Sequence, residues 1–124
     1  MPIEIFEPER HGRRVSLGPG VEANLIVRGA EGVRHGVMVM LRVDAGRGYV
    51  STLPAGAEDA WYVIEGRGVA ADLQTGRTES VEPGCLIAVE PKSRVAIWAT
   101  PGPLLMVGGP TPPGTPLGTA ETAR

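Results

Sequence analysis

Several residue types are scarce in this 124-residue chain, and each scarcity excludes a class of protein. The single cysteine, Cys85, cannot form an internal disulfide and cannot build a thiolate zinc site by itself. The basic residues are scattered and the formal net charge is −2, so we expect no nucleic acid partner. No apolar run approaches the roughly 20 residues that cross a bilayer, and the first residues lack the apolar segment of a secretory signal. We therefore expect a cytoplasmic protein with no membrane partner.

Glycine and proline, by contrast, are abundant and leave little room for long helices. The chain has 18 glycines and 12 prolines, and its apolar residues stand in short runs between them. The expected strands cover residues 3–6, 21–28, 37–43, 50–53, 61–65, 68–73, 78–81, 85–89, 94–98 and 104–107. Short strands at such regular spacing predict an all-β sandwich or barrel.

Two segments suggest contacts beyond a single sheet. Residues 37–43 read VMVMLRV, which is apolar on both faces and predicts cover from another layer or subunit on the second face. The sequence after Gly108 is rich in proline and glycine and has little to bury. We expect one domain over residues 1–108, followed over residues 109–124 by a flexible tail or an arm on a neighbouring surface, such as a dimer partner.

Two blocks of the sequence carry a family resemblance. The stretch from Asp59 to Gly68, DAWYVIEGRG, is followed by VEPGC from Val81 to Cys85, and together they resemble the two conserved blocks of the cupins. The first cupin block has the form G-x5-H-x-H-x4-E-x6-G, and Gly46, Asp59 and Gly66 stand at matching intervals. The resemblance implies a cupin-type double-stranded β-helix, a jelly-roll barrel.

The metal-ligand positions of that pattern are replaced here. Thr52 and Pro54 occupy the two histidine positions of the first block, and Val95 occupies the histidine position of the second. Since a transition metal needs several nitrogen and oxygen donors that converge on one point, we expect no metal and no cofactor. An unorthodox metal site that uses His35, Asp59 or Cys85 remains the alternative.

If the replaced positions face inward, strand alternation extends the same face to their neighbours and predicts a ligand pocket. Its expected lining is Val50, Thr52, Asp59, Trp61, Val63, Val95, Ile97 and Ala99. The opposite set is Tyr49, Ser51, Tyr62, Ile64, Arg94 and Trp98, and it faces outward or toward a partner. Met38 and Met40 either line the pocket or fill the core.

Asp59 and Trp61 are the residues of greatest chemical interest. A carboxylate in apolar surroundings has a raised pKa and could exchange a proton with a substrate as a catalytic group. Asp59 could instead be exposed at the start of a strand. Trp61 offers a flat surface for a ring or an unsaturated chain, or it simply fills the barrel.

Three functions are compatible with these residues. The first is a metal-independent enzyme that binds an apolar or unsaturated organic molecule and assists cyclisation, isomerisation or elimination in a biosynthetic pathway. The second is a non-catalytic module that binds or senses a small molecule, and the third is a cupin enzyme with a non-standard metal. A homodimer is expected in each case, because the strand over residues 37–43 and the outward set with Tyr62, Ile64 and Trp98 need cover.

Overall fold

The computed structural model describes residue 3, residues 5–28 and residues 37–121. Within these residues it contains one helical turn, α1 (Pro8–His11), and eleven strands. The first five strands are β1 (Arg13–Gly18), β2 (Val21–Arg28), β3 (Val37–Val43), β4 (Gly48–Thr52) and β5 (Glu58–Glu65). The others are β6 (Gly68–Asp72), β7 (Thr78–Val81), β8 (Leu86–Val89), β9 (Arg94–Ala99), β10 (Leu104–Thr111) and β11 (Thr119–Glu121). The all-β prediction is confirmed.

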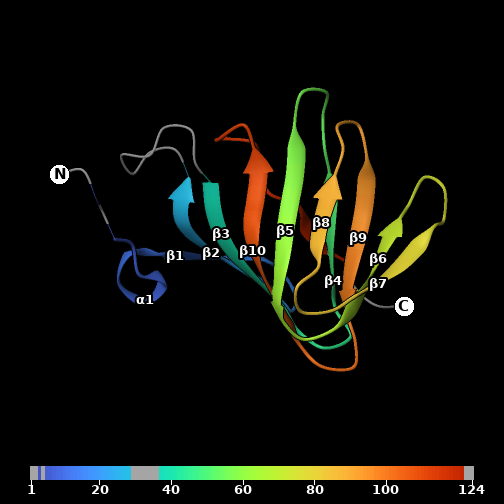
Figure 1. The fold of residues 1–124 in the computed structure, drawn as a ribbon, viewed down its shortest axis with the longest axis horizontal. Coiled ribbons are helices and arrows are strands. Elements are labelled where there is room, and N and C mark those ends of the chain that lie inside the picture. Colours follow the sequence, from blue (N-terminus) through green and yellow to red (C-terminus); the bar gives the residue numbers. More distant parts are fainter. Residues whose placement is uncertain (1–2, 4, 29–36, 122–124) are drawn as a thin grey trace.

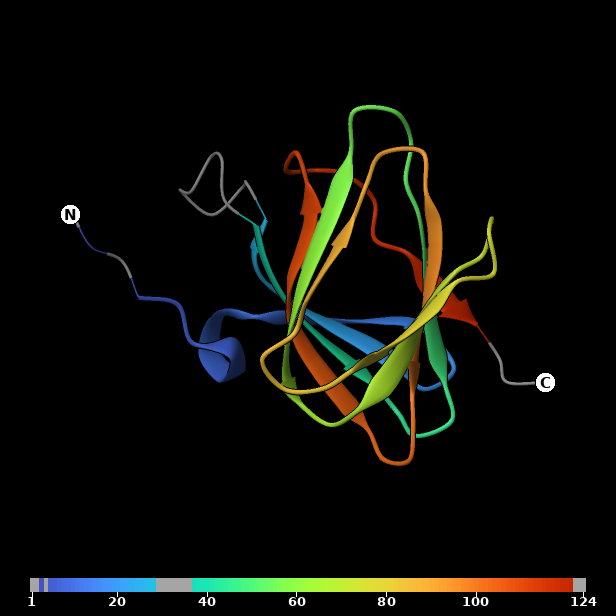
Figure 2. The same ribbon diagram turned by 45° about the vertical axis from the view of Figure 1, so that its right-hand side comes forward.

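The strands form two antiparallel sheets that face each other (Figures 1 and 2). Sheet A has the order β1-β2-β3-β10-β5-β8, and sheet B has the order β11-β4-β9-β6-β7. Their inner faces carry the largest buried side chains, which are Leu41, Tyr49, Trp61, Ile97, Leu104 and Met106. Tyr49 of sheet B meets Trp61 of sheet A edge to face, with ring centroids 5.7 Å apart, so the two layers interlock at this point.

The two sides on which the edge strands of the sheets face each other differ in how closely those strands approach. On one side β1 and β11 approach closely, because a Cβ atom on Gly18 would lie 2.7 Å from the Cβ of Ala120. On the other side the edge strands are β8 of sheet A and β7 of sheet B, and no ladder joins them within the described residues. The barrel is therefore open between β7 and β8.

The residues after Gly108 are an arm on the chain's own barrel up to Glu121. Strand β10 continues to Thr111 rather than ending at residue 107, and Gly108 allows this because a Cβ there would lie 1.9 Å from the carbonyl oxygen of Ala60. Strand β11 then pairs with β4, and the backbone N–H of Gly118 donates to the Tyr49 hydroxyl at 2.8 Å. Up to Glu121 this segment lies on the sheets of its own chain, and the expectation of a flexible tail or of an arm on a dimer partner stays a prediction.

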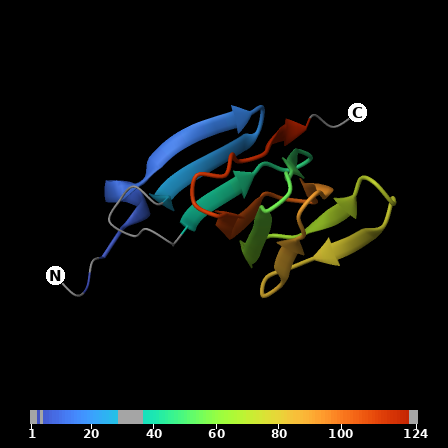
Figure 3. The same cartoon turned by 90° about the horizontal axis from the view of Figure 1, so that it is seen from above.

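The N-terminal residues differ from the prediction. No strand covers residues 3, 5 and 6, and the described residues before α1 run away from the sheets (Figure 3). The side chains of Ile3 and Ile5 are exposed. The chain enters α1 instead, with Pro8 at the start of the turn, where its missing N–H costs no hydrogen bond. Among the described residues, no helix has the length and apolar character that a membrane span requires.

Candidate active site

The strand pattern of β5 points a carboxyl group into the barrel. Alternate residues of β5 are buried, and Asp59, Trp61 and Val63 form the inward set. Asp59 is only 3 % exposed, so the expectation of an exposed aspartate at the start of the strand is wrong. Its partners across the two ladders are Val89 of β8 and Pro110 of β10, and neither side chain carries a polar atom.

Strand β4 supplies the polar partner of this carboxyl group. The register of β4 against β9 places Tyr49 opposite Ile97 and Ser51 opposite Val95, so these four residues share the inner face. Ser51 is 1 % exposed, and its hydroxyl donates a hydrogen bond to Asp59 Oδ2. A serine from one sheet thus contacts an aspartate from the other inside the barrel.

Two polar atoms beside this contact are buried without a hydrogen-bond partner, Asp59 Oδ1 and Trp61 Nε1. Burial raises the pKa of Asp59 above its usual 3.8, and the Ser51 hydroxyl and the Trp61 indole lower it as the smaller causes. The indole N–H is near enough to favour the charged carboxylate, although it does not reach the carboxylate with the geometry of a normal hydrogen bond. The site therefore holds a buried carboxylate oxygen without a hydrogen bond and, near the same carboxyl group, a buried indole N–H.

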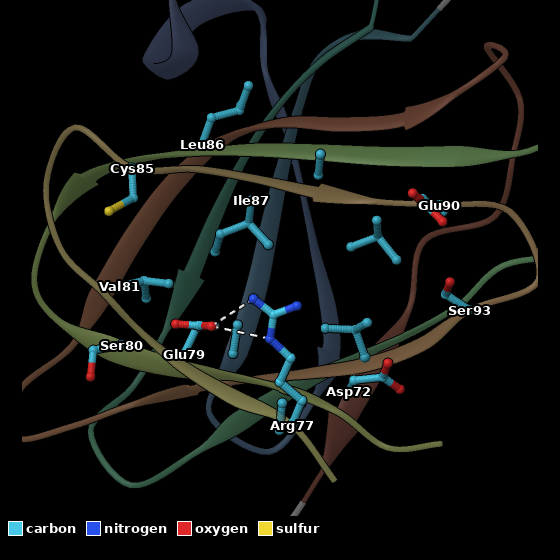
Figure 4. Close-up of a pocket in the computed structure, with 15 residues that line it drawn as sticks. Asp72, Arg77, Glu79, Ser80, Val81, Cys85, Leu86, Ile87, Glu90 and Ser93 are labelled. Atoms are coloured by element: carbon cyan, nitrogen blue, oxygen red, sulfur yellow. Dashed lines mark hydrogen bonds and ion pairs between the residues drawn. The ribbon is translucent and has the colours of Figure 1, made fainter. Parts of the chain in front are cut away.

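A pocket of about 500 Å³ lies in the opening between β7 and β8 (Figure 4). Its apolar lining consists of Ala70, Ala71, Val81, Cys85, Leu86, Ile87, Ala88, Val89 and Val95. Its polar lining consists of Asp72, Arg77, Glu79, Ser80, Glu90 and Ser93. Arg77 and Glu79 form an exposed ion pair with a shortest distance of 2.8 Å. The pocket has an apolar interior and a charged rim, which suits a small organic molecule with an apolar body.

The pocket and the Ser51–Asp59 pair meet at two valines. Val89 lies opposite Asp59 in the β5–β8 ladder, and Val95 lies opposite Ser51 in the β4–β9 ladder. Directly opposed residues on one face have Cβ atoms about 4.5–5.5 Å apart. Both valines also line the pocket, so each of them contacts the pocket and lies beside one member of the buried pair.

The described inner face does not fit a transition metal. Ser51 and Asp59 bring one hydroxyl and one carboxylate together, and the flanking residues have no donor side chain. Over residues 5–28 and 37–121 together with residue 3, no group of three His, Cys, Asp or Glu side chains comes together. His35 lies outside the described residues, so the alternative site that includes it stays a prediction. His11 is on α1, where its Nδ1 accepts the backbone N–H of Glu7.

Several predicted pocket residues do not lie where we expected. On β4 the inward phase is Tyr49 and Ser51, whereas Thr52 is exposed and Val50, although buried, lies outside the main core cluster. A shift of one residue moves every side chain of a strand to the other face, and this shift accounts for the whole error.

The two methionines are also misplaced. On β3 the inward set is Val39, Leu41 and Val43, so Met38 and Met40 face outward and Met38 is 42 % exposed. Because β3 carries apolar residues on both faces, its sequence does not indicate which set points into the barrel.

The other predicted residues lie on the inner face. Trp61, Val63, Ile97 and Ala99 are fully buried, and Val95 is half-buried at the pocket. Contact of these residues with a ligand stays a prediction. The outward prediction for Tyr62 and Ile64 is confirmed, since they are 47 % and 40 % exposed.

Sequence reasoning missed Ser51 and the residues of β6, β7 and β8 that form the pocket. One signal for Ser51 was present, because its phase on β4 includes Tyr49 and Leu53, which bring more apolar volume than Val50 and Thr52. No motif pairs β7 with β8, since they are the edges of two different sheets. The pocket between them depends on the three-dimensional arrangement alone.

No family model and no curated protein matches the chain. Solved structures do match. An uncharacterized conserved protein with a double-stranded β-helix domain from Klebsiella pneumoniae is similar with a TM-score of 0.71 and 16 % identity, over 98 % of each chain. KdgF from Halomonas sp. gives a TM-score of 0.71 and 15 % identity over 88 % of this chain and 94 % of its own. An RmlC-like cupin from Shewanella frigidimarina gives a TM-score of 0.63 and 20 % identity over 88 % of this chain and 93 % of its own. The chain therefore has the fold of a small cupin, as its sequence resemblance implied.

Proposed function

We propose that this protein is a small cupin enzyme that binds an organic molecule in the pocket between β7 and β8 and transfers a proton through Asp59 without a metal. The observation that carries the proposal is the buried Ser51–Asp59 pair, in which Asp59 Oδ1 has no hydrogen-bond partner and the indole of Trp61 is near enough to the carboxyl group to lower its pKa. An isomerisation, a cyclisation or an elimination each needs such a group and no redox partner.

The chemistry follows from the environment of the carboxylate. Burial raises the pKa of Asp59, so its ionised form is a stronger base than an exposed aspartate. It takes a proton from a carbon beside a carbonyl group, while the Trp61 N–H donates to the carbonyl oxygen, where negative charge develops. The carboxyl group then returns that proton, to a second carbon in an isomerisation or to the expelled leaving group in an elimination.

Ser51 acts as a positioning residue in this scheme. Its hydroxyl occupies Oδ2 and leaves Oδ1 as the oxygen that faces the substrate. Val89 and Val95 each line the pocket and lie beside one member of the pair, so in this scheme a substrate reaches Asp59 when these two side chains move apart. Such apolar side chains keep water away from the reacting carbon.

Solvent deuterium exchange tests the proposal before the natural substrate is identified. Wild-type protein is incubated in D2O with a panel of small unsaturated ketones such as cyclohex-2-enone, and NMR measures deuterium at the carbons beside the carbonyl. We expect incorporation above the buffer rate for at least one compound, and we expect Asp59→Asn to reduce it by about 10²–10⁴-fold.

Asp44→Asn is the matched control, because it makes the same chemical change in an exposed carboxyl group that does not line this pocket. The control should exchange at the wild-type rate. Exchange that survives in the Asp59 variant would remove Asp59 from the mechanism.

A binding module without catalysis is the second candidate, and one observation favours it. Neither Ser51 nor Asp59 lines the pocket, so a ligand could fill that space without contact with the buried carboxyl group. Thermal-shift measurements on the same panel separate the two functions. Compounds that raise the melting temperature of wild type and of Asp59→Asn equally, without exchange in either, would indicate binding alone.

A further inference from the structure

After Thr111 the chain crosses from sheet A to sheet B (Figure 2). We call residues 112–121, which include β11, the C-terminal arm. Strand β11 pairs with β4 and places Ala120 opposite Tyr49. Since β4 also carries Ser51, whose hydroxyl donates to Asp59, the arm lies on a strand that builds the candidate site.

The arm contacts Tyr49 through the backbone of Gly118. The Gly118 N–H donates to the Tyr49 hydroxyl at 2.8 Å. A Cβ atom on Gly118 would overlap the carbonyl oxygen of Val50 and would lie 2.9 Å from Tyr49 Cζ. The arm therefore reaches the hydroxyl group because this residue is glycine, and any larger residue must push the arm or the ring away.

Tyr49 carries this contact into the barrel. Its ring meets the Trp61 ring edge to face, with an interplanar angle of 79° and 5.7 Å between the centroids. Both side chains are 0 % exposed, so neither ring can turn unless its neighbours move. Because the arm holds the hydroxyl end of Tyr49, the position of the Tyr49 ring against Trp61 depends on the arm.

The orientation of the Trp61 ring decides where its N–H points. An indole N–H lies in the plane of the ring and can only donate, so a rotation of the ring redirects the donor. Among the described residues Trp61 Nε1 has no hydrogen-bond partner, and so no hydrogen bond of its own fixes the ring. Packing holds it instead, and Tyr49 is the aromatic part of that packing.

We propose that the C-terminal arm, acting through Tyr49, sets the direction of the Trp61 N–H, and that Tyr49 is a positioning residue for the proton transfer. The first part stands on the contacts alone. The second part rests on the proposed function, in which the Trp61 N–H donates to the carbonyl oxygen of the substrate. A hydroxyl group that only satisfied the Gly118 N–H would stabilise the fold without any effect on Trp61.

The indole signals in ¹H–¹⁵N correlation spectra test the first part. The chain has two tryptophans, Trp61 and Trp98, and the signal that Trp61→Phe abolishes belongs to Trp61. Tyr49→Phe removes only the hydroxyl group, and Gly118→Ala leaves Tyr49 chemically intact. We expect both variants to shift the Trp61 signal in the same direction and by more than the Trp98 signal.

Each variant has a matched control. Tyr62→Phe makes the same change in the chain's other tyrosine, whose exposed side chain lies on the outer face of β5. Gly102→Ala adds the same methyl group at a place where no heavy atom lies within 4 Å of the new Cβ. Both controls should leave the Trp61 signal in place.

Circular dichroism spectra that match wild type show that each variant is folded. Tyr49→Phe adds no atom to the core and keeps the test decisive if Gly118→Ala does not fold.

The deuterium exchange assay tests the second part. With a compound that wild-type protein labels, Tyr49→Phe and Gly118→Ala should each lower the exchange rate by about 3–10-fold, which corresponds to the loss of one hydrogen bond. The rate should fall less than in Asp59→Asn, because the carboxyl group remains. The two controls should keep the wild-type rate.

Two results would overturn the inference. A Trp61 signal that stays in place in Tyr49→Phe and Gly118→Ala, or that moves equally in the controls, would show that the arm does not direct the ring. A signal that moves while exchange keeps the wild-type rate, in a protein whose exchange Asp59→Asn abolishes, would remove Tyr49 from the reaction. Wild-type protein that labels no compound would contradict the proposed function and with it the second part, and the Trp61 signal would still decide the first.

Discussion

Two aspartates, one at the rim of the pocket and one buried beside its lining residue Val89, have pKa values that their surroundings change in opposite directions. Asp59 has its pKa raised by burial. Asp72, at the rim, has its pKa lowered, first by the backbone N–H of Gln74, which donates to Oδ1 at 2.9 Å. The same side chain is thus an unfavourable charge in the buried position and a stabilised turn residue at the rim.

The two aspartates differ in what their charge contributes to the stability of the fold. Asp72 organises the turn between β6 and β7 and gains from its charge, which accounts for its presence without any chemistry. Asp59 stands on the inner face of a strand, where an apolar residue would serve the fold better. The proposed catalytic role of Asp59 rests on this buried carboxyl group with one unpartnered oxygen.

The largest effect should come from the aromatic ring at the buried site. Trp61→Ala removes the fully buried side chain that packs edge to face on Tyr49, and we expect a loss of about 3–5 kcal/mol in the free energy of unfolding. Urea denaturation followed by circular dichroism measures the loss. Trp61→Phe keeps most of the packing and should lose much less.

A substitution at the exposed rim of the pocket should, in contrast to Trp61→Ala, leave stability unchanged. Arg77→Ala removes the exposed ion pair with Glu79 and should leave the urea midpoint unchanged within error. An equal loss in the Arg77 and Trp61 variants would mean that the rim and the buried site do not differ as described.

The sequence was sufficient for the fold class and for most strands because strand signals are local, but it did not predict β1 or β11. Glycine and proline mark the turns, and Gly76 has the positive φ of 82° that the turn between β6 and β7 requires. The inward phases of β5 and β9 were also predicted correctly, but from the family pattern that places Asp59 and Val95 inward, because both faces of these strands carry apolar residues.

The site was only half predictable, and the reason is register. On β4, Val50 and Thr52 were chosen as inward from the spacing of a family pattern, but the ladder with β9 fixes Tyr49 and Ser51 there. Spacing along a chain does not determine which residue of a short strand faces a partner strand. Asp59 was therefore found from the sequence, and the hydroxyl group that holds it was not.

Removal of the Ser51 hydroxyl group should cause a smaller loss of stability than removal of the Trp61 ring. Ser51→Ala leaves Asp59 Oδ2 buried without its donor, which should destabilise the protein at pH 7 by about 1–3 kcal/mol. Ser80→Ala at the exposed rim is the matched control and should be neutral. In the background of Asp59→Asn the loss from Ser51→Ala should shrink, and an unchanged loss in this double-mutant cycle would show that Ser51 acts through packing alone.

The smallest effects, and the most direct test of the comparison, lie in the pH dependence of stability. The pKa of Asp59 is raised in the folded state, so its contribution to stability is fully present below about pH 3.8 and is lost as the pH rises through the folded pKa. Asp59→Asn should remove this pH-dependent loss. At neutral pH the free energy of unfolding of the variant should exceed that of wild type by about 0.5–2 kcal/mol, because replacing a destabilising residue of a functional site commonly stabilises a protein.

Asp72 has the opposite sign, because its pKa is lowered in the folded state. Its contribution is present above about pH 3.8 and disappears as the pH falls through the folded pKa. Asp72→Asn should therefore be slightly less stable than wild type at neutral pH and equal to it in acid. Urea midpoints from pH 3 to pH 8 for wild type and both variants should give two difference curves of opposite sign. Curves of the same sign would mean that burial does not set the charge state of Asp59, and the proton-transfer role would lose its physical basis.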